Sequence, residues 1–157
     1  MTNATAQAPI RVLIVCTHNS ARSQMAEALL ERRGGRDFDV SSAGTEASNV
    51  HPLAIRVLQE SGFDTGGLRS KSVGEFLGQR FDYVITVCDQ ARQACPVFPG
   101  EGQRLHWGYD DPSEVEGSDE ERLAAFRHVF TALGERIGLF VPIALRARDE
   151  SAVAAGR

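Results

Sequence analysis

The feature that most constrains the fold of this chain is the alternation of short aliphatic segments with amphipathic ones. Ile10 to Cys16, IRVLIVC, is rich in Val and Ile, which is typical of a strand buried in a parallel sheet. A segment with helical spacing follows at residues 23–33. Further strands are expected at residues 38–42, 81–88 and 104–107, and further helices at residues 52–61, from Ser72 and from Ser118. This order predicts a single α/β domain with a central parallel sheet of about four strands and helices on both faces.

The last predicted helix has the clearest pattern. Ser118 and Glu121 have the spacing of a capping box, which marks a helix start. Apolar residues then recur every three or four positions and form one stripe that faces a core: Leu123, Phe126, Phe130, Leu133, Ile137 and Phe140. After Val141 the residues are mostly Ala, Arg and small polar types. We therefore expect a domain at residues 10–141, a flexible N-terminal tail at 1–9 and a C-terminal tail at 142–157.

Charge and hydropathy argue against several kinds of partner. The 157 residues carry a net charge of −4 and no basic run, whereas nucleic-acid binding needs clustered Lys and Arg. The first nine residues lack the basic start and apolar run of a secretory signal. No apolar stretch approaches the roughly 20 residues of a membrane span. We expect a soluble, cytoplasmic monomer that binds neither nucleic acid nor membranes.

The stretch VCTHNSARS, between the first strand and the first helix, carries the strongest chemical signal. Cys16 ends the strand, and Arg22 follows six positions later. A loop wrapped before a helix turns backbone N–H groups inward, and the helix end adds a positive partial charge. Arg22 adds a planar fork of donors suited to a tetrahedral oxyanion, so we expect a lowered pKa for the Cys16 thiol. The alternative is a buried strand-end cysteine followed by a polar helix cap.

The anion-binding segment predicted from this stretch consists of Thr17, His18, Asn19, Ser20, Ala21, Arg22 and Ser23. Ser23 is placed to donate a hydrogen bond to the Cys16 sulfur. Asn19 can brace the loop with its amide and tolerates a left-handed backbone. His18 stands where glycine would be easier if the loop needs a positive φ.

Two further cysteines and an acidic loop extend the candidate site. Cys88 ends another predicted strand, so it should lie at the same sheet edge as Cys16. Cys95 follows a polar surface segment, DQARQA, and the pair suggests thiol–disulfide exchange, although each alone is also consistent with a packing cysteine. In WGYDDP, an acid before Pro112 would protonate a leaving oxygen if it faced the loop, but Asp-Pro is also common in turns.

The sequence shows no pattern that calls for a metal or an organic cofactor. The four histidines lack metal-ligand spacing with each other or with the cysteines: they are His18, His51, His106 and His128. No nicotinamide or flavin fingerprint is present. We therefore predict no metal and no cofactor.

Four segments in order, VCTHNSARSQMAEALL, SSAGTE, DYVITVCDQARQACPVFPG and HWGYDDPSEVEG, resemble the thioredoxin-coupled arsenate reductases, which have the low-molecular-weight tyrosine phosphatase fold. The resemblance covers about residues 10–141. It implies that Cys16 attacks arsenate held by the loop and Arg22, and that Asp111, directly before Pro112, is the general acid that protonates the departing hydroxyl.

The same resemblance implies a three-cysteine relay. Cys88 would attack the Cys16–arsenic adduct, so that arsenite leaves and a Cys16–Cys88 disulfide forms. Cys95 would then attack Cys88, and thioredoxin would reduce the resulting Cys88–Cys95 disulfide nearer the surface. Reducing As(V) to As(III) takes two electrons, and converting a dithiol to a disulfide supplies two.

Some positions match the family and others depart from it. Asn19 and Ser42 resemble its loop-supporting residues. His18 stands where the nearest relatives usually carry glycine, and Ala21 where they often carry cysteine. Lys71 stands where some members have an acid that helps hold a potassium ion under the loop. An ammonium group there could replace the ion.

Two other functions would use the same residues. A low-molecular-weight tyrosine phosphatase would resolve a phosphocysteine with water, but Ser113 and Glu114 follow Asp-Pro here instead of aromatic residues that grip a phosphotyrosine. It would also have no need for Cys88 with Cys95. A non-catalytic anion or redox sensor would need no general acid at Asp111.

Overall fold

The computed structural model of the chain describes residues 7–100 and 102–156. Of the predicted N-terminal tail, residues 1–6 lie outside the described residues, and residues 7–9 precede the first strand. The elements in chain order are β1 (Ile10–Cys16), α1 (Arg22–Gly34), η1 (Gly35–Asp37), β2 (Phe38–Gly44), α2 (Pro52–Glu60), η2 (Val73–Phe76), β3 (Tyr83–Thr86), α3 (Asp89–Ala94), β4 (Gln103–His106), η3 (Pro112–Glu114) and α4 (Asp119–Ala155), where η marks a 3₁₀ turn.

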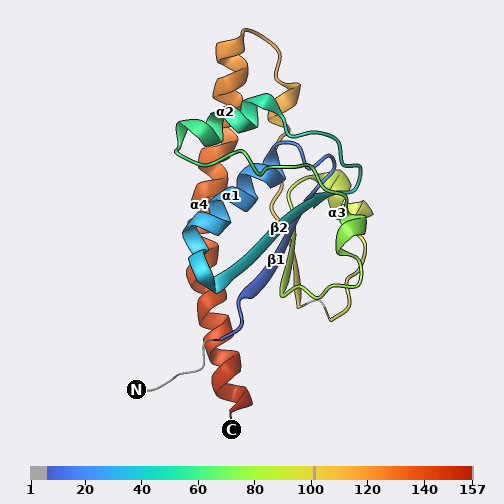
Figure 1. Cartoon of the computed structure of the whole chain (residues 1–157), viewed down its shortest axis with the longest axis vertical. Helices are drawn as coiled ribbons and strands as arrows, with labels where there is room; N and C mark the ends of the chain where they lie inside the picture. The colour runs from blue at the N-terminus through green and yellow to red at the C-terminus, as the bar shows by residue number, and fades with distance from the viewer. Residues whose placement is uncertain (1–6, 101, 157) are drawn as a thin grey trace.

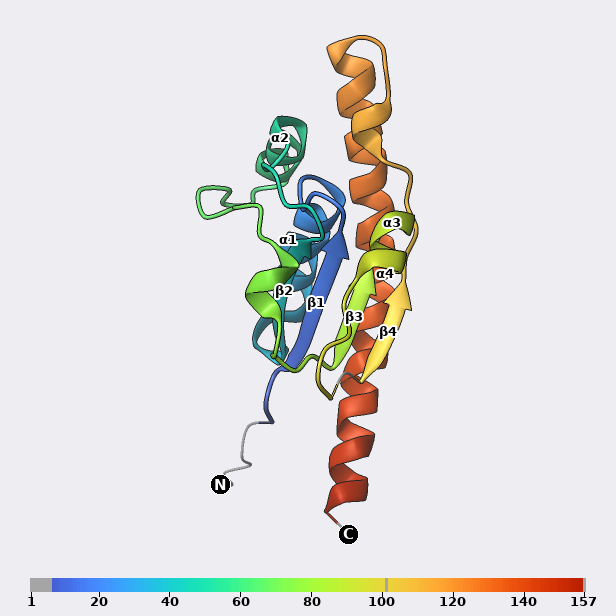
Figure 2. The same cartoon turned by 90° about the vertical axis from the view of Figure 1, so that its right-hand side faces the viewer.

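The four strands form one parallel sheet in the order β2-β1-β3-β4, which confirms the predicted sheet. Figure 1 shows α1 and α4 on one side of the sheet and α3 on the other. In the register, Cys16 of β1 pairs with Gly44, and Thr86 of β3 pairs with both Val15 and His106. The carboxyl ends of the strands therefore meet at one edge, where sheets of this kind bind ligands. Figure 2 shows that the end of α4 lies at the opposite end of the molecule.

The last helix begins as predicted and continues beyond the predicted domain end. The capping box is present, with Glu121 N donating to Ser118 Oγ and Ser118 N donating to Glu121 Oε1, both at 3.1 Å. The buried stripe of α4 packs against α1 and reaches Ala144. The helix then runs to Ala155, so the expected C-terminal tail at 142–157 is helical over most of its length. Ala, Arg and Glu are strong helix formers, which explains why the helix continues without apolar periodicity.

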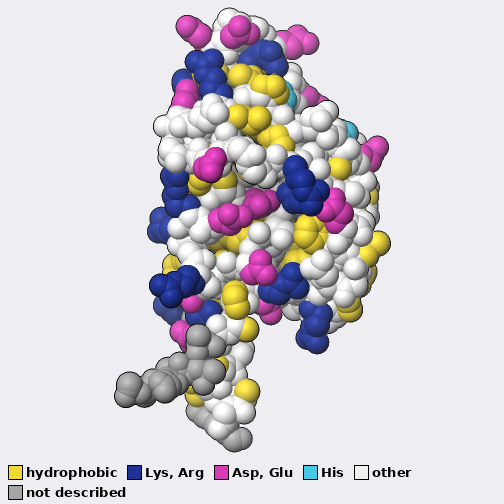
Figure 3. Space-filling model, in the orientation of Figure 1, with side chains coloured by type: hydrophobic (Ala, Val, Ile, Leu, Met, Phe, Trp, Pro, Cys, Tyr) yellow, Lys and Arg dark blue, Asp and Glu magenta, His cyan; other side chains and the backbone are white. Residues whose placement is uncertain are grey.

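By length and composition, α4 also meets the requirements for a membrane span, so the expectation that no stretch approaches such a span is too strict. A core helix passes the same test. Here Leu123, Leu133 and Ile137 of α4 are buried in the common core, whereas Leu139 and Ile143 of the same helix are exposed. On the face drawn in Figure 3, acidic and basic side chains are interspersed.

The sequence patterns miss one helix. α3 covers the polar segment between Cys88 and Cys95, and these two cysteines are its cap residues. Its six residues bury only the side chain of Ala91, and such a short helix has little intrinsic stability. The predicted short helix from Ser72 is the 3₁₀ turn η2, which Ser72 caps by accepting from Gly74 N at 3.0 Å.

Candidate functional site

The loop between Cys16 and Arg22 turns its carbonyl groups away from the site. They accept hydrogen bonds of 2.7–3.1 Å from the segment after β2: Cys16 O from Thr45 N, Thr17 O from Glu46 N, His18 O from Ser48 N and Ser20 O from His51 N. Since the C=O and N–H of one peptide unit point in opposite directions, the loop N–H groups face inward. A Cβ at Gly44 would lie 2.6 Å from Thr17 O, so glycine permits this close approach. No side chain caps the start of α1 at Ala21, which leaves first-turn N–H groups for an anion.

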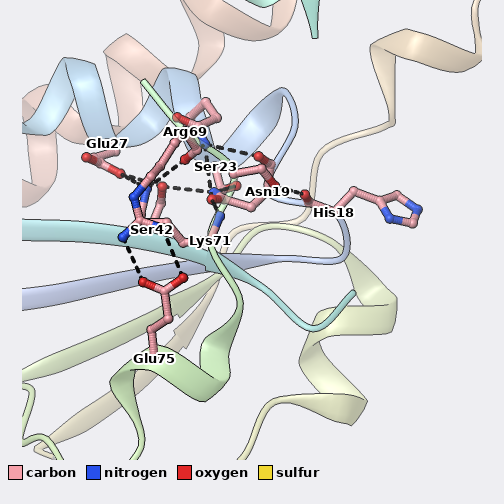
Figure 4. Close-up of polar contacts among 10 residues, drawn as sticks. His18, Asn19, Ser23, Glu27, Ser42, Arg69, Lys71 and Glu75 are labelled. Atoms are coloured by element: carbon pink, nitrogen blue, oxygen red, sulfur yellow. Dashed lines mark hydrogen bonds and ion pairs between the residues drawn. The ribbon is translucent and has the colours of Figure 1, made fainter. Parts of the chain in front are cut away.

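Asn19 is the centre of a buried polar network behind the loop (Figure 4). Its φ of 49° places it in the left-handed region. Its Nδ2 donates to Ser23 Oγ at 2.8 Å and to Ser42 Oγ at 2.9 Å. Its Oδ1 accepts from Gln24 Nε2 at 3.0 Å and from Lys71 N at 2.8 Å. Four hydrogen bonds to a fully buried amide fix the loop in a single conformation.

A half-buried ion pair lies next to this network. Lys71 Nζ is 3.5 Å from Glu27 Oε1 and donates to Arg69 O at 3.0 Å. Ser42 Oγ donates to the same Glu27 oxygen. Burial and the hydrogen bond with Glu27 raise the pKa of Glu31 to about 7. Lys71 therefore places a positive charge beside the residues that support the loop.

Sequence reasoning did not find Gln24 and Glu27, which belong to this support. Both lie in the first turns of α1 and follow the loop directly. Gln24 is fully buried, so its Nε2 can donate to Asn19 O at 3.0 Å and to Arg69 O at 2.9 Å. The signal that could have found it is a polar residue on the apolar face of a predicted helix.

His18 does not cause the backbone difficulty expected for it, because Asn19 takes the positive φ. Figure 4 shows the His18 imidazole pointing away from the buried network. The side chain is exposed, and its Nδ1 donates to Glu46 O at 3.0 Å. His18 therefore joins the loop to the segment after β2.

Cys88 lies beside Cys16, as expected for the ends of neighbouring strands. Each thiol shifts the pKa of the other, and Thr17 Oγ1 lies 3.2 Å from Cys88 Sγ. The hydrogen bond with Cys16 lowers the pKa of Cys88 to about 5. The same bond and burial raise the pKa of Cys16, although Arg22 acts in the opposite direction. The lowered pKa expected at Cys16 is thus found at Cys88, because two adjacent thiols share one proton and only one of them ionises readily.

Arg22 and Asp111 close the other side of the loop. Arg22 Nη1 donates to Tyr109 O at 2.8 Å, and its Nη2 lies 3.6 Å from Asp111 Oδ2. Asp111 Oδ1 accepts from Ser113 N at 2.9 Å and from Ser113 Oγ at 2.7 Å. The turn interpretation of the Asp-Pro sequence is therefore confirmed, because Asp111 Oδ1 caps the turn η3, while Oδ2 faces Arg22.

A small cavity of about 80 Å³ joins the loop to the acidic segment. Its lining residues are Cys16, His18, Ser20, Ala21, Arg22, Ser48, Asp111 and Ser113. A wider polar groove of about 680 Å³ shares Arg22 and Asp111 with this cavity and extends along Thr17 and Cys88. Asn19 and Ser23 are buried supports behind the loop. The arrangement places a thiol, a guanidinium and a carboxyl group around one small space.

Cys95 lies apart from the other two cysteines. It is buried at the far end of α3, and its Sγ lies 3.6 Å from Pro96 O. Cys88 and Cys95 are seven positions apart across the helix, which corresponds to about 10 Å along a helix axis. A disulfide needs Cα atoms within about 7 Å. A bond between these two cysteines therefore requires α3 to unwind.

Comparisons with known proteins identify the relatives of this chain. Residues 11–150 match the family described as low molecular weight phosphotyrosine protein phosphatase. An arsenate reductase of Halalkalibacterium halodurans is 43% identical over 129 residues, which cover 82% of this chain and 93% of that protein. A solved structure of an arsenate reductase in oxidized state is 31% identical, with a TM-score of 0.72 over 84% of this chain and 96% of the other. A thioredoxin-dependent arsenate reductase of Corynebacterium glutamicum is 33% identical, with a TM-score of 0.57 over 85% of this chain and 65% of the other.

Proposed function

This chain belongs to the low molecular weight phosphotyrosine protein phosphatase family, and we propose that it is an arsenate reductase that converts arsenate to arsenite. The observation that carries this proposal is a second thiol beside the first, since Cys88 Sγ lies 3.2 Å from the hydroxyl of Thr17, the residue that follows Cys16. A phosphatase resolves its thiol ester with water and needs no second thiol there. A reductase needs one, because two electrons must come from the protein.

In the first step, arsenate binds to the inward N–H groups of the loop and to Arg22. The proton shared by the two sulfurs passes to Cys88, which leaves Cys16 as the thiolate. The Cys16 sulfur bonds to arsenic, and one oxygen leaves as water after taking a proton from Asp111. Asp111 Oδ2 is the oxygen placed for this role, because Oδ1 is held by Ser113 and Asp111 lines the cavity with Cys16.

In the second step, the Cys88 thiol passes its proton to an oxygen of the bound arsenic group, and its sulfur attacks the Cys16 sulfur. The new bond joins the two sulfurs, and the electron pair of the broken sulfur–arsenic bond stays on arsenic. Arsenic is thereby reduced from As(V) to As(III) and leaves as arsenite, while two thiols are oxidised to one disulfide.

In the third step, the Cys95 thiolate attacks Cys88 and displaces Cys16 as a thiolate. This exchange transfers no electrons, so the oxidising equivalent only moves to the Cys88–Cys95 pair. Thioredoxin then returns both cysteines to thiols. Unwinding of α3 is required, which brings Cys95 out of its buried position. We place this cycle in the cytoplasm, in a monomer that needs no metal, with Lys71 supplying the positive charge near the loop.

The experiment that tests this function is arsenate-dependent NADPH oxidation with thioredoxin and thioredoxin reductase, using wild type and three single variants. Cys16→Ser should form no adduct. Cys88→Ser should stop with Cys16 modified, and Cys95→Ser should accumulate the Cys16–Cys88 disulfide. Mass spectrometry of the stopped proteins identifies these states. Normal turnover by Cys95→Ser with thioredoxin would exclude the relay.

A phosphatase reaction is the second candidate, because phosphate and arsenate are similar tetrahedral anions and the loop would hold either. It would use Cys16, Arg22 and Asp111 but neither Cys88 nor Cys95. Hydrolysis of an aryl phosphate by Cys88→Ser at the wild-type rate, without any arsenate reduction by wild type, would favour it.

A further inference from the structure

His106 contacts one residue that precedes Cys88 in the chain and one that follows it. Its Nδ1 lies 2.8 Å from the hydroxyl of Thr86, two residues before Cys88. Its Nε2 lies 3.1 Å from Oδ1 of Asp89, the residue after Cys88. Because a carboxylate only accepts hydrogen bonds, Nε2 carries a proton and donates to Asp89. One imidazole ring therefore links the end of β3 to the first residue of α3.

The two ends of this link differ in how firmly they are held. His106 is the last residue of β4, it pairs with Thr86 in the sheet, and its side chain is 20% exposed. Asp89 begins α3, and its side chain is 90% exposed. A Cβ at Gly108 would lie 3.1 Å from His106 Nε2, so glycine there leaves room for the contact. The imidazole is thus a fixed point on the sheet, and the carboxylate belongs to the segment that must rearrange.

We propose that His106 is a positioning residue that holds the start of α3 through Asp89, so that Cys88 faces Cys16 until the contact breaks and Cys88 moves to Cys95. This inference rests on the proposed thiol relay. It assigns the contact to one step, the exchange of the Cys16–Cys88 disulfide for the Cys88–Cys95 disulfide. The Cys95 thiolate forms a bond to Cys88, the Cys16–Cys88 bond breaks, and Cys16 leaves as a thiolate.

The direction of the effect follows from the geometry. With Cys16 bonded to Cys88, α3 can keep its first turn and the contact of His106 with Asp89 persists. With Cys88 bonded to Cys95, α3 is unwound and Asp89 is carried away from the fixed imidazole. The contact therefore favours the Cys16–Cys88 disulfide. Its loss should shift the disulfide ratio toward Cys88–Cys95 by up to about fivefold, the upper end expected for a charge-assisted hydrogen bond whose carboxylate is largely exposed.

The test measures this ratio directly. Wild type and variants are equilibrated in a redox buffer of reduced and oxidised dithiothreitol, quenched with acid, alkylated and mapped by mass spectrometry. Oxidised dithiothreitol accepts the two electrons, so no arsenate is needed. Failure of the proposed arsenate reduction would therefore appear in the NADPH assay and leave this measurement intact.

Four substitutions distinguish loss of the contact between His106 and Asp89 from a nonspecific loss of structure. Asp89→Ala and His106→Asn should both shift the ratio by up to about fivefold. The shorter side chain of His106→Asn still reaches Thr86 but not Asp89. His106→Gln, which places an amide nitrogen near the former Nε2, should restore a ratio close to wild type. The control His128→Asn changes an exposed histidine on α4 and should leave the ratio unchanged.

Unchanged ratios in both Asp89→Ala and His106→Asn would overturn the proposal. A shift in His106→Asn without one in Asp89→Ala would also overturn it, because the effect would then not pass through Asp89. Far-ultraviolet circular dichroism of each variant confirms that the protein is folded. Asp89 is so exposed that its replacement should not prevent folding.

Discussion

The anion loop and the helix α3 lie side by side but are built in opposite ways. The loop places Asn19 fully buried among four side-chain hydrogen bonds, and its carbonyl groups are tied to the segment after β2. α3 has six residues and buries only Ala91. The anion loop is fixed by many hydrogen bonds, whereas α3 depends on a few contacts at its ends.

This difference matches what each region has to do in the proposed reaction. An oxyanion is bound best by donors that need no rearrangement when charge develops. A thiol that must meet first Cys16 and then Cys95 has to move by several ångströms. The fold therefore combines a rigid anion loop with a marginally stable helix α3, and Cys88 lies at the boundary between them.

Among changes near the anion loop, Asp111→Asn should lower the arsenate-dependent rate the most. An amide cannot supply the proton that the leaving oxygen needs, so we expect the arsenate-dependent rate to fall by about 10²- to 10⁴-fold. Steady-state NADPH oxidation measures this. Asp110→Asn is the matched control at the neighbouring position and should remain near wild type. An anion or redox sensor would be indifferent to either change.

The thiol pair at the boundary predicts a pH dependence of stability. The pKa of Cys88 is lowered from 9.0 to about 5, so between these values the folded protein binds fewer protons than the unfolded chain. The free energy of unfolding under reducing conditions should therefore rise from pH 5 to pH 9. Above pH 9, Cys16 keeps its proton in the folded protein because its pKa is raised, so the free energy of unfolding should fall with pH. Urea unfolding across this range measures the trend, and Cys88→Ser should lose this part of the slope. Equal slopes in both proteins would mean that the thiols do not share a proton.

Asn19→Ala tests the rigidity of the anion loop. It removes four hydrogen bonds and leaves buried partners unsatisfied, so the free energy of unfolding should fall by about 3 kcal/mol. Urea denaturation provides the measurement. Asn49→Ala, at an exposed position, should change it by less than about 0.5 kcal/mol. Similar values for the two variants would show that the loop is not held as the contacts indicate.

The smallest effect is expected in α3. Ala94→Gly should lower the free energy of unfolding by about 1 kcal/mol or less, because the residue is exposed at the end of a short helix. It should accelerate the exchange from Cys88 to Cys95 by up to about fivefold, since unwinding becomes easier. Quenched-flow disulfide mapping follows this step. Ala124→Gly in α4 is the matched control and should not change it.

The sequence predicted the sheet because its signals are local. Ile10–Cys16 and Tyr83–Thr86 are apolar runs typical of buried strands, and α4 begins at its capping box. The continuation of α4 past residue 141 was missed, because a stripe of buried residues marks where a helix packs and not where it ends. α3 was missed because its polar residues show no periodicity.

In the candidate site, too, some features were predicted from the sequence and others were not. Spacing and chain order indicated Cys16 and Arg22, and the family resemblance indicated Asp111; the structure brings all three around one cavity. The distribution of the proton between Cys16 and Cys88 did not follow, because it depends on the contact of two sulfurs from different strands.

By itself, the sequence determined that this protein forms a parallel α/β sheet, with a loop and a helix after its first strand and with Cys16 and Cys88 on the same edge of the sheet. Periodicity and turn chemistry encode these properties along the chain. Only the tertiary structure decided that Asn19 takes the left-handed backbone, that Lys71 pairs with Glu27, and that His106 reaches Asp89. Each of these contacts joins residues far apart in the chain or depends on burial, and both are properties of the packed molecule.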